Sequence, residues 1–507
     1  MHKTVEMQCA GVRRRFRLLT LLGVLVLAGC AVGPDYQQPA QVVGSAYGGM
    51  ASPVTSDERN RGWVAVSAST PARAASWWKA FSDPVLDTLM LQLEQENLSI
   101  QRAEAQYRQA LAVLRQTRAG FFPTVGSSAS LTRSGTGSTT GAGDNPSNQY
   151  SLAGSVSWEP DVWGRVRRSV EGGQAGAQAS QADVQAMRLS MQSTLAQTYI
   201  RLRAADAEQE LLQDTVKAYE RSLQLVQNRF QAGVASQADI ESSRAQLENA
   251  RAQYVAAQRE RAQLENALAV LVGQPPSGFS VPPSGSLPQL PVVPVGLPSE
   301  LLLRRPDIVA AERRAAQANA QIGVAQSAWF PDLTLSAQAG FRSGQWAQWL
   351  TAPASFWSLG PALALTIFDG GAREGRLQET RAAYDAQVAD YRLTALTALR
   401  EVEDFLVALD LLSQEQTVQG RALAAARESL RLTRNQYDAG LIDYLSVVQV
   451  ETTAFSAERT ALGLRADRLL NSVQLLTALG GGWQGLQLGT DDALSAQAQP
   501  AAVLPAQ

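Results

Sequence analysis

The chain has 507 residues, of which 45% are hydrophobic and 18% are charged, and its formal net charge is −2. A balance so close to neutrality excludes the basic surface that a nucleic-acid-binding protein needs. No run of 18 apolar residues occurs after residue 30, so we expect no membrane-spanning helix in the rest of the chain.

The first thirty residues contain a basic cluster at 13–17 followed by an apolar run from Leu18 to Ala28. Such a run suits a secretory signal and is too short to span a membrane. It ends in Leu27-Ala28-Gly29-Cys30, which resembles a bacterial lipobox. We therefore expect removal of a signal peptide at 1–29 and a covalent lipid on Cys30. Residue 31 is not the aspartate that favours inner-membrane retention in related lipoproteins, so we expect delivery to the outer membrane.

An ordinary signal peptide with a chance cysteine is the alternative, but the only other cysteine, Cys9, lies in the segment to be removed. The sole histidine, His2, lies in the same segment. A mature chain without histidine and with one acylated cysteine excludes disulfides, His/Cys metal sites and nucleophile–histidine catalysis. Three acids, Glu401, Glu403 and Asp404, could suggest a metal or acid/base site, but Glu401 and Glu403 point apart on a helix and no histidine accompanies them. We expect no enzyme activity, no metal and no cofactor other than the lipid on Cys30.

Two Pro-rich segments divide the mature chain. We expect a lipidated tether at 30–75, a first repeat at 76–274, a Pro-rich linker at 275–298, a second repeat at 299–483 and a disordered tail at 484–507. The linker carries no charge, and its prolines cannot continue a helix, so we expect a connector that does not pack a core.

An internal duplication is predicted from three pairs of markers that share an offset of 208 or 207 residues. These pairs are Phe122-Pro123 with Phe330-Pro331, Asp161 with Asp369, and Asn228–Gly233 with Asn435–Gly440. Each half predicts the same order of elements, namely a helix, two strands and a long helical hairpin.

Very long helices dominate both halves. The first half predicts helices at 84–119, 164–230 and up to 272, and the second predicts helices at 300–328, up to 437 and up to 479. Roughly 65 helical residues would span about 100 Å. Apolar residues at Ile240, Leu247 and Tyr254 repeat every seven positions, which indicates coiled-coil packing. On the helices alone, a plain structural coiled coil is the preferred interpretation.

Three segments alternate between apolar and small polar residues, and a fourth, 124–133, does so weakly. Alternating segments of about ten residues are typical of transmembrane β-strands. A soluble β-sandwich is the alternative, which a secreted lipoprotein with four such strands disfavours. The residues predicted to face lipid are Tyr150, Leu152, Val156, Trp158, Leu333, Leu335, Phe341, Trp357, Leu359, Leu363, Leu365 and Ile367.

Four strands cannot close a barrel alone, and lipid does not tolerate an open sheet edge. Two chains would give eight strands, whose interior side chains fill, whereas three chains would give twelve and begin to leave a lumen. We therefore expect an α+β membrane protein in which a trimer shares one twelve-stranded β-barrel.

Motifs in both halves resemble the TolC-like outer-membrane efflux protein family, in the lipoprotein subgroup that serves resistance–nodulation–division (RND) exporters. The motifs that carry the resemblance are Cys30–Pro39, Trp77-Trp78, Phe121–Thr124, Trp158-Glu159, Leu303–Ile308, Glu401–Asp404 and Ala478–Trp483. The resemblance implies a homotrimer that contacts outer-membrane lipid, with the long helices forming a periplasmic α-barrel. It also implies a periplasmic adaptor (membrane fusion) protein and an inner-membrane RND pump as partners.

The family narrows to a gate near the hairpin turns, which here contain Gly233 and Gly440. One gate position that usually carries an acid matches Asp239. The acidic rings of some members would fall on Ser446 and Gln449, where this chain departs from the family. In their place, Asp443 and Glu451 would carry a negative lining, or Leu441, Tyr444 and Leu445 would hold the gate, and Tyr437 is a further candidate. The alternative for Asp239 and Asp443 is that they cap helices.

The function expected from this resemblance is a passive outer-membrane duct of a tripartite efflux system, through which drugs or small molecules leave the cell. Two alternatives remain. One is the outer-membrane duct of a type I secretion system, and the other is a periplasmic adaptor lipoprotein, a class that usually carries a single helical hairpin.

Overall fold

The computed structural model describes residues 32–40, 63–65, 76–135, 146–291, 293–295 and 305–481. The predicted signal peptide, Cys30 and the tail at 484–507 lie outside these ranges, as do most of the predicted tether and the last part of the linker. No helix in the described ranges is both long and apolar enough to cross a membrane.

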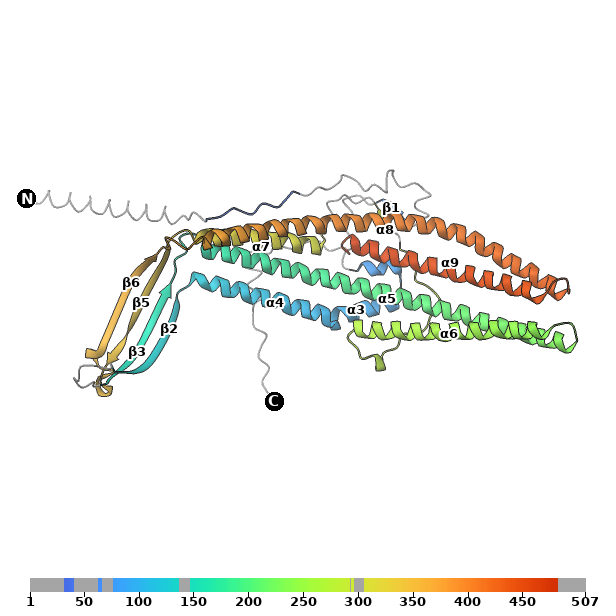
Figure 1. The fold of residues 1–507 in the computed structure, drawn as a ribbon, viewed down its shortest axis with the longest axis horizontal. Coiled ribbons are helices and arrows are strands. Elements are labelled where there is room, and N and C mark those ends of the chain that lie inside the picture. Colours follow the sequence, from blue (N-terminus) through green and yellow to red (C-terminus); the bar gives the residue numbers. More distant parts are fainter. Residues whose placement is uncertain are drawn as a thin grey trace, which may run out of the picture. The chain divides into compact units, whose positions relative to one another are not determined.

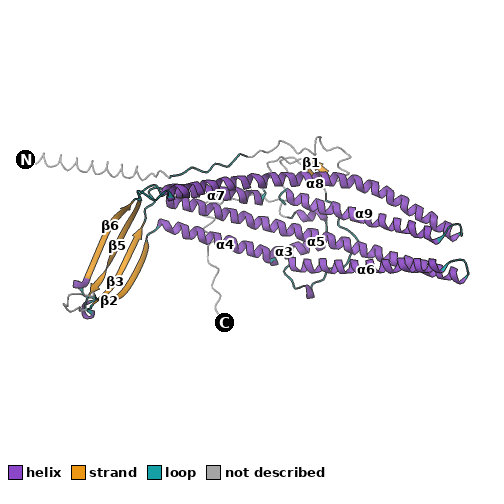
Figure 2. Cartoon of the chain, viewed as in Figure 1, coloured by secondary structure: helices purple, strands orange, loops and turns teal. Residues whose placement is uncertain are grey.

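The two halves repeat one order of helix, two strands and helical hairpin, except that the first half has two helices before its strands and the second has one (Figures 1 and 2). The first half consists of α3 (Pro84–Glu96), α4 (Leu98–Arg118), β2 (Thr124–Ser134), β3 (Ser147–Trp158), α5 (Arg165–Gln231) and α6 (Gln237–Leu271). The second half consists of α7 (Pro306–Ser327), β5 (Asp332–Ser343), β6 (Ser355–Ala364), α8 (Ala372–Asp438) and α9 (Tyr444–Ala478). Helices α5 and α8 both have 67 residues, and α6 and α9 both have 35. A short parallel pair joins β1 (Trp63–Ala65) to β4 (Val293–Val295).

Two predicted boundaries were wrong. The helix predicted at 84–119 is broken at Asn97, whose side-chain oxygen accepts hydrogen bonds from the amides of Ser99 and Ile100 and so starts a new helix. Residues 300–304 of the helix predicted at 300–328 lie outside the described ranges, and helix α7 begins at Pro306, because proline favours the first helical position. Strand β6 ends at Ala364, so the predicted lipid-facing residues Leu365 and Ile367 lie beyond the strand.

The described residues form two compact units, and each unit contains segments of both halves. One unit holds the four long strands and the helical segments next to them. The other holds the ends of both helical hairpins and the 3-10 helix η1 (Trp77–Phe81).

The four long strands form one antiparallel sheet in the order β2-β3-β5-β6 (Figure 2). Leu152 lies opposite Phe341, and Leu335 opposite Pro361, and directly opposed residues project from the same face of a sheet. The predicted apolar residues of all the strands therefore share one face. The other face carries mainly Ser, Thr, Gln, Gly and Ala. Trp357 on the apolar face is 79% exposed, so this chain alone leaves the face open.

Aromatic side chains lie at both ends of the strands. At the loop end, Tyr150 contacts Trp346 and Trp349, with ring centroids 5.4 and 6.0 Å apart. At the helix end, Trp163 stacks on Phe330 with centroids 4.9 Å apart. Aromatic bands at both ends of apolar strands are typical of sheets that cross a membrane.

Residues 32–40 form an extended strap on the unit that contains the sheet. The amide of Val32 donates to the carbonyl of Trp163 at 3.1 Å. Arg168, which is buried, donates to the carbonyls of Val32 and Gly33 and pairs with Asp35 at 2.8 Å. The strap is thus held next to the junction between strand β3 and helix α5.

The Pro-rich linker is fixed by a buried ionic network. Asp206 accepts hydrogen bonds from Arg203 at 3.0 Å and from Arg261 at 2.6 Å, and the same two arginines donate to the linker carbonyls of Pro282 and Val281. Val281 is 2% exposed and belongs to the main core. The expectation that the linker does not pack a core was therefore wrong. Its backbone polar groups are satisfied by charged side chains, which permits burial.

The helical hairpins pack along narrow seams. On α6, Ile240 and Leu247 are buried as predicted and Tyr254 is half-buried. The positions three residues after each of them carry Ser243, Ala250 and Ala257, which are buried. Small residues at these positions let neighbouring helices approach closely. At their ends, the α5–α6 and α8–α9 hairpins contact each other through side chains.

Candidate functional site at the helical hairpin ends

Both helical hairpins turn through the same backbone motif. In the first turn the amide of Gly233 donates to the carbonyl of Phe230, and that of Val234 to Arg229, each at 2.9 Å, which is a Schellman motif. The second turn repeats both bonds around Gly440. The φ angles of Gly233 and Gly440 are +78° and +75°, and no atom lies within 4 Å of a Cβ added at either position. Glycine is therefore required for its backbone angle rather than for space.

An acid stabilises the start of the helix after each turn. Ser236 and Asp239 form a capping box at the start of α6, in which each side chain accepts a hydrogen bond from the backbone amide of the other. The carboxylate of Asp443 accepts from the amide of Ser446 at 3.1 Å and from its hydroxyl at 2.6 Å. These bonds hold the pKa of Asp443 below its ordinary value. The capping role considered for both acids is confirmed, and their role in a gate stays a prediction.

Two predicted gate residues meet in a buried cluster between the hairpins. Tyr437 and Tyr444 have ring centroids 5.6 Å apart, and they pack against Val226 and Ile240 of the other hairpin together with Val447. Burial raises the pKa of Tyr437, so its phenol stays neutral near pH 7. The cluster joins the α5–α6 hairpin to the α8–α9 hairpin.

The hydroxyl of Tyr444 links the α8–α9 hairpin to two serines of the α5–α6 hairpin. It lies 3.0 Å from the hydroxyl of Ser222 on α5 and donates to that of Ser243 on α6 at 3.1 Å. Tyr444 and Ser243 are 3% and 1% exposed, so water does not reach these hydroxyls in the chain as described. Breaking the contact would leave buried polar groups unpaired, which is costly.

Arg229 forms a second link between the hairpins. Its guanidinium lies 4.1 Å from the ring centroid of Tyr437 and donates to the backbone carbonyls of Tyr437 at 3.0 Å and Asp438 at 3.3 Å. A cation over an aromatic ring adds to the attraction of these hydrogen bonds. Together, Arg229 and Tyr444 form what we call the latch.

A buried acid lies deeper along the α8–α9 hairpin. Glu451 is 4% exposed, and its Oε1 accepts from Nε and Nη2 of Arg434 at 3.1 and 2.8 Å. Its other oxygen, Oε2, is buried without a hydrogen-bond partner. Burial, with the neighbouring Glu451 carboxylate, raises the pKa of Tyr219 to about 12. Glu451 and Arg434 therefore form an ion pair within the α8–α9 hairpin, and one oxygen of the Glu451 carboxylate has no hydrogen-bond partner.

The outer side of the turns is apolar and exposed. Val234 and Leu441 hold the same position in the two turns, and each is 74% exposed. Leu445, at 56%, and Gln449 lie four residues apart and so share the exposed face of α9. Leu445 and Gln449 thus point away from the tyrosine cluster.

Sequence reasoning found part of this site. It identified both turns, both tyrosines and Glu451, but it missed Arg229, Ser222 and Arg434. It expected Glu451 in the lining of the gate, whereas Glu451 is buried against Arg434. Ser243 carried a usable signal, since it occupies a heptad seam position where the following turns have alanine. Nothing in the local sequence indicates the partners of Arg229, which lie about two hundred residues further along the chain. In the described ranges, no three His, Cys, Asp or Glu side chains come together as a metal site would require.

Solved outer-membrane channels share this fold. The outer-membrane channel OprN has a TM-score of 0.80 and 30% sequence identity, and the match covers 90% of this chain and 100% of OprN. The open state of the MtrE channel of Neisseria gonorrhoeae has a TM-score of 0.76 and 29% identity, and the match covers 90% of this chain and 99% of MtrE. These likenesses define the class of the protein, a TolC-like outer-membrane channel.

The chain belongs to the outer membrane efflux protein family, which matches residues 89–274 and 297–481. A relative from Pseudomonas putida, the probable efflux pump outer membrane protein TtgC, is 32% identical over 464 residues, which cover 90% of this chain and 94% of TtgC. The resemblance inferred from sequence motifs is confirmed, and the protein is an efflux component of the outer membrane. The alternative of a periplasmic adaptor is ruled out by this family membership.

Proposed function

We propose that the protein is the passive exit duct of a tripartite RND-type efflux system. In this proposal a periplasmic adaptor and an inner-membrane pump deliver drugs or other small molecules to the duct. Energy comes from the pump, so the duct itself needs no catalytic group and no cofactor. The proposal extends to this chain the role that the name of its relative TtgC states for that protein.

The observation that carries the proposal is the shared apolar face of the four-stranded sheet. Strands β2 and β6 are the edges of this sheet, and each pairs with one neighbour in the described chain. An unpaired edge is not tolerated in lipid, so further strands have to come from other copies. Three copies close a barrel of twelve strands, which is wide enough to begin to leave a lumen.

The equal lengths of α5 and α8, and of α6 and α9, support an internal duplication. Two ion pairs at equivalent places in the two hairpins also support it, with the acid and the arginine exchanged between the helices. Glu220 on α5 pairs with Arg251 on α6 at 2.8 Å, and Arg427 on α8 pairs with Glu458 on α9 at 2.7 Å. Both residues of the first pair lie 207 positions before those of the second. Each hairpin therefore has an ion pair at the same place, but the acid lies on the first helix in one hairpin and on the second helix in the other.

The latch is the part of the site proposed to hold the duct closed. Arg229 and Tyr444 join one hairpin to the other through about four hydrogen bonds, each worth on the order of 1 kcal/mol. A partner that binds the open arrangement more tightly by a similar amount would shift the equilibrium toward opening. Leu445 and Gln449, on the exposed face of α9, are proposed to line the passage.

The strap supports a lipid on Cys30. Val32 is two positions after Cys30, a separation of at most about 7 Å, so such a lipid would lie close to Trp163 and the aromatic residues at the strand ends. Metabolic labelling with palmitate tests this point. Labelled wild-type chain and unlabelled Cys30→Ser chain are expected, and equal labelling of both would contradict it.

A strain that lacks the chain tests the function. It should accumulate a fluorescent efflux dye, and expression of the intact chain should restore dye efflux. Unimpaired dye efflux together with loss of an exported protein would instead favour the type I secretion duct.

A further inference from the structure

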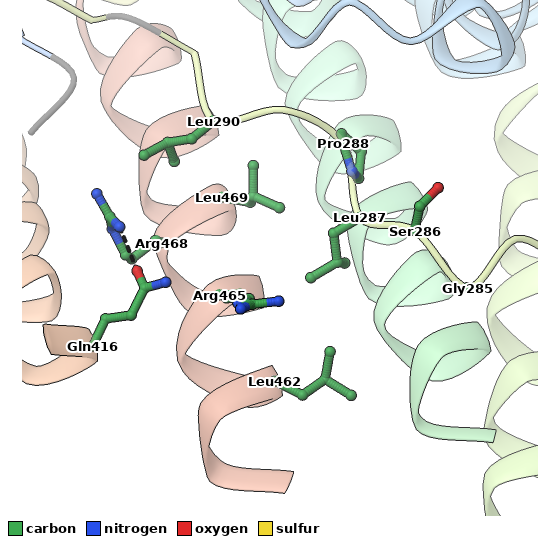
Figure 3. A pocket seen from close by; sticks show the side chains of 10 residues that line it. All are labelled: Gly285, Ser286, Leu287, Pro288, Leu290, Gln416, Leu462, Arg465, Arg468 and Leu469. Atoms are coloured by element: carbon green, nitrogen blue, oxygen red, sulfur yellow. Dashed lines mark hydrogen bonds between the residues drawn. The ribbon is translucent and has the colours of Figure 1, made fainter. Parts of the chain in front are cut away.

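The linker and helix α9 enclose a pocket of about 420 Å³ (Figure 3). One wall is the linker segment from Gly285 to Leu290, and the other is the surface of α9, with Gln416 of α8 at one side. Two arginines of α9, Arg465 and Arg468, line it. The pocket belongs neither to the latch nor to the sheet.

The charge of Arg468 is not balanced by any described acid. Its guanidinium donates to the neutral side chain of Gln416, and its Nε is buried without a partner. Burial lowers the pKa of Arg468, and no carboxylate offsets this cost. Arg465, three residues earlier on the same helix, forms no ion pair with a described residue either. A half-buried guanidinium with an unused donor is a binding group for an anion.

The rest of the pocket wall is mainly apolar. The apolar lining residues are Leu287, Pro288, Leu290, Leu462 and Leu469. One acid, Glu210, has its carboxylate beside Gly285 at the rim, and it makes no ion pair with Arg465 or Arg468. The pocket therefore matches a peptide that carries carboxylates next to an aliphatic side chain.

We propose that residues 482–507 of the same chain dock in this pocket, with Asp491 and Asp492 against the two arginines and Leu494 against the leucines. This segment contains no Lys or Arg, and Asp491 and Asp492 are its only charged side chains. Its charge is thus complementary to that of the pocket. The proposal concerns the attachment of the C-terminal segment and does not depend on the duct function.

The reach of the segment agrees with this assignment. Arg468 lies 13 residues before Gly481, which corresponds to about 20 Å along a helix. The ten residues from Gly481 to Asp491 extend to about 33 Å, so the segment can fold back along α9 to the pocket. A tethered segment also has a high effective concentration at a site so close to its attachment, which favours it over acids of a separate protein.

Disulfide crosslinking in intact outer membranes tests the proposal. Leu494→Cys combined with Leu462→Cys leaves every charge in place, and the expected mature chain has no other free cysteine. We expect an intramolecular disulfide, detected by mass spectrometry of the digested band. The control pair combines Leu494→Cys with Thr460→Cys, because Thr460 is exposed and lies on the opposite face of α9. Equal crosslinking in both pairs, or a disulfide between two chains, would overturn the proposal.

Charge variants in the crosslinking background test the role of the arginines. Asp491→Asn with Asp492→Asn should lower the disulfide yield about fivefold, as expected for loss of a partly exposed ion pair. Asp491→Glu with Asp492→Glu keeps the charges and should leave the yield close to that of the parent. A yield that is insensitive to neutralisation would show that the arginines do not recruit this segment.

Discussion

The guanidinium of Arg229 lies 4.1 Å from the ring centroid of Tyr437 and joins the end of the α5–α6 hairpin to the end of the α8–α9 hairpin. The same group donates to two backbone carbonyls at the end of α8. One arginine thus holds both the side chain and the backbone of the neighbouring turn. Moving the hairpins apart has to break all three contacts together.

Replacement of Arg229 should loosen the closed state. Arg229→Ala removes a cation–π contact and two hydrogen bonds, a loss of about 1–2 kcal/mol. The expected result is a conductance several-fold higher in planar lipid bilayers. Arg221→Ala is the matched control, because Arg221 is exposed on the same helix and donates to a carbonyl of its own helix. Equal conductance of both variants and of the wild type would remove Arg229 from the latch.

The hydroxyl of Tyr444 gives an independent test. Tyr444→Phe keeps the ring in the buried cluster but leaves the hydroxyls of Ser222 and Ser243 without this partner, at a cost of about 1–3 kcal/mol. We expect more frequent opening events in single-channel recordings. Tyr254→Phe should behave like the wild type, because Tyr254 is a half-buried tyrosine of α6 whose hydroxyl bonds to no described residue. A latch variant with unchanged opening frequency would show that the contact does not hold the duct closed.

The acid at the start of α9 predicts a specific dependence on pH. Hydrogen bonds from Ser446 lower the pKa of Asp443 in the folded chain, so its contribution to stability is fully present above the ordinary value of 3.8. The contribution is lost as pH falls through the lowered folded pKa. The difference in melting temperature between wild type and Asp443→Ala should therefore be constant from pH 7 to pH 5 and shrink below pH 4. Circular dichroism measures this difference, and its disappearance already at pH 5 would contradict the capping role.

The ion pairs Glu220–Arg251 and Arg427–Glu458 carry their charges in opposite order along the chain. We therefore expect that either order of charges stabilises the hairpin, provided that the two charges are opposite. Arg251→Glu places a carboxylate beside those of Glu220 and Glu248 and should lower the melting temperature slightly, since these ion pairs are exposed. Adding Glu220→Arg should restore it, because the reversed pair has the arrangement of Arg427 and Glu458. A double variant that melts below the single variant would count against equivalence of the two hairpins.

Local patterns in the sequence were sufficient to predict the long helices and the four long strands, though not all of their boundaries. Helix α5 was expected at 164–230 and spans Arg165–Gln231, because a glycine precedes it and another follows it closely. The break at Asn97 was missed, since an asparagine inside an apolar-periodic segment marks a cap only when its side chain turns back to the amides that follow. Strand β6 was predicted too long because the alternation continues beyond the last residue that pairs with β5.

The contacts of the candidate site could not be predicted in the same way. Turn glycines and aromatic residues are visible in the sequence, whereas the pairing of Arg229 with Tyr437 depends on how two separate hairpins pack. The burial of Val281 was also unforeseen, since it requires Arg203 and Arg261 to satisfy the backbone of the linker. In each case the missing information was a contact between residues far apart in the chain.

The most direct test of the central claim is the mass of the complex extracted from outer membranes in mild detergent. A sheet with one apolar face and two open edges predicts three chains per particle, which together close one barrel. A monomeric particle would leave the edges of β2 and β6 unpaired in lipid and would contradict a shared barrel and the duct built on it.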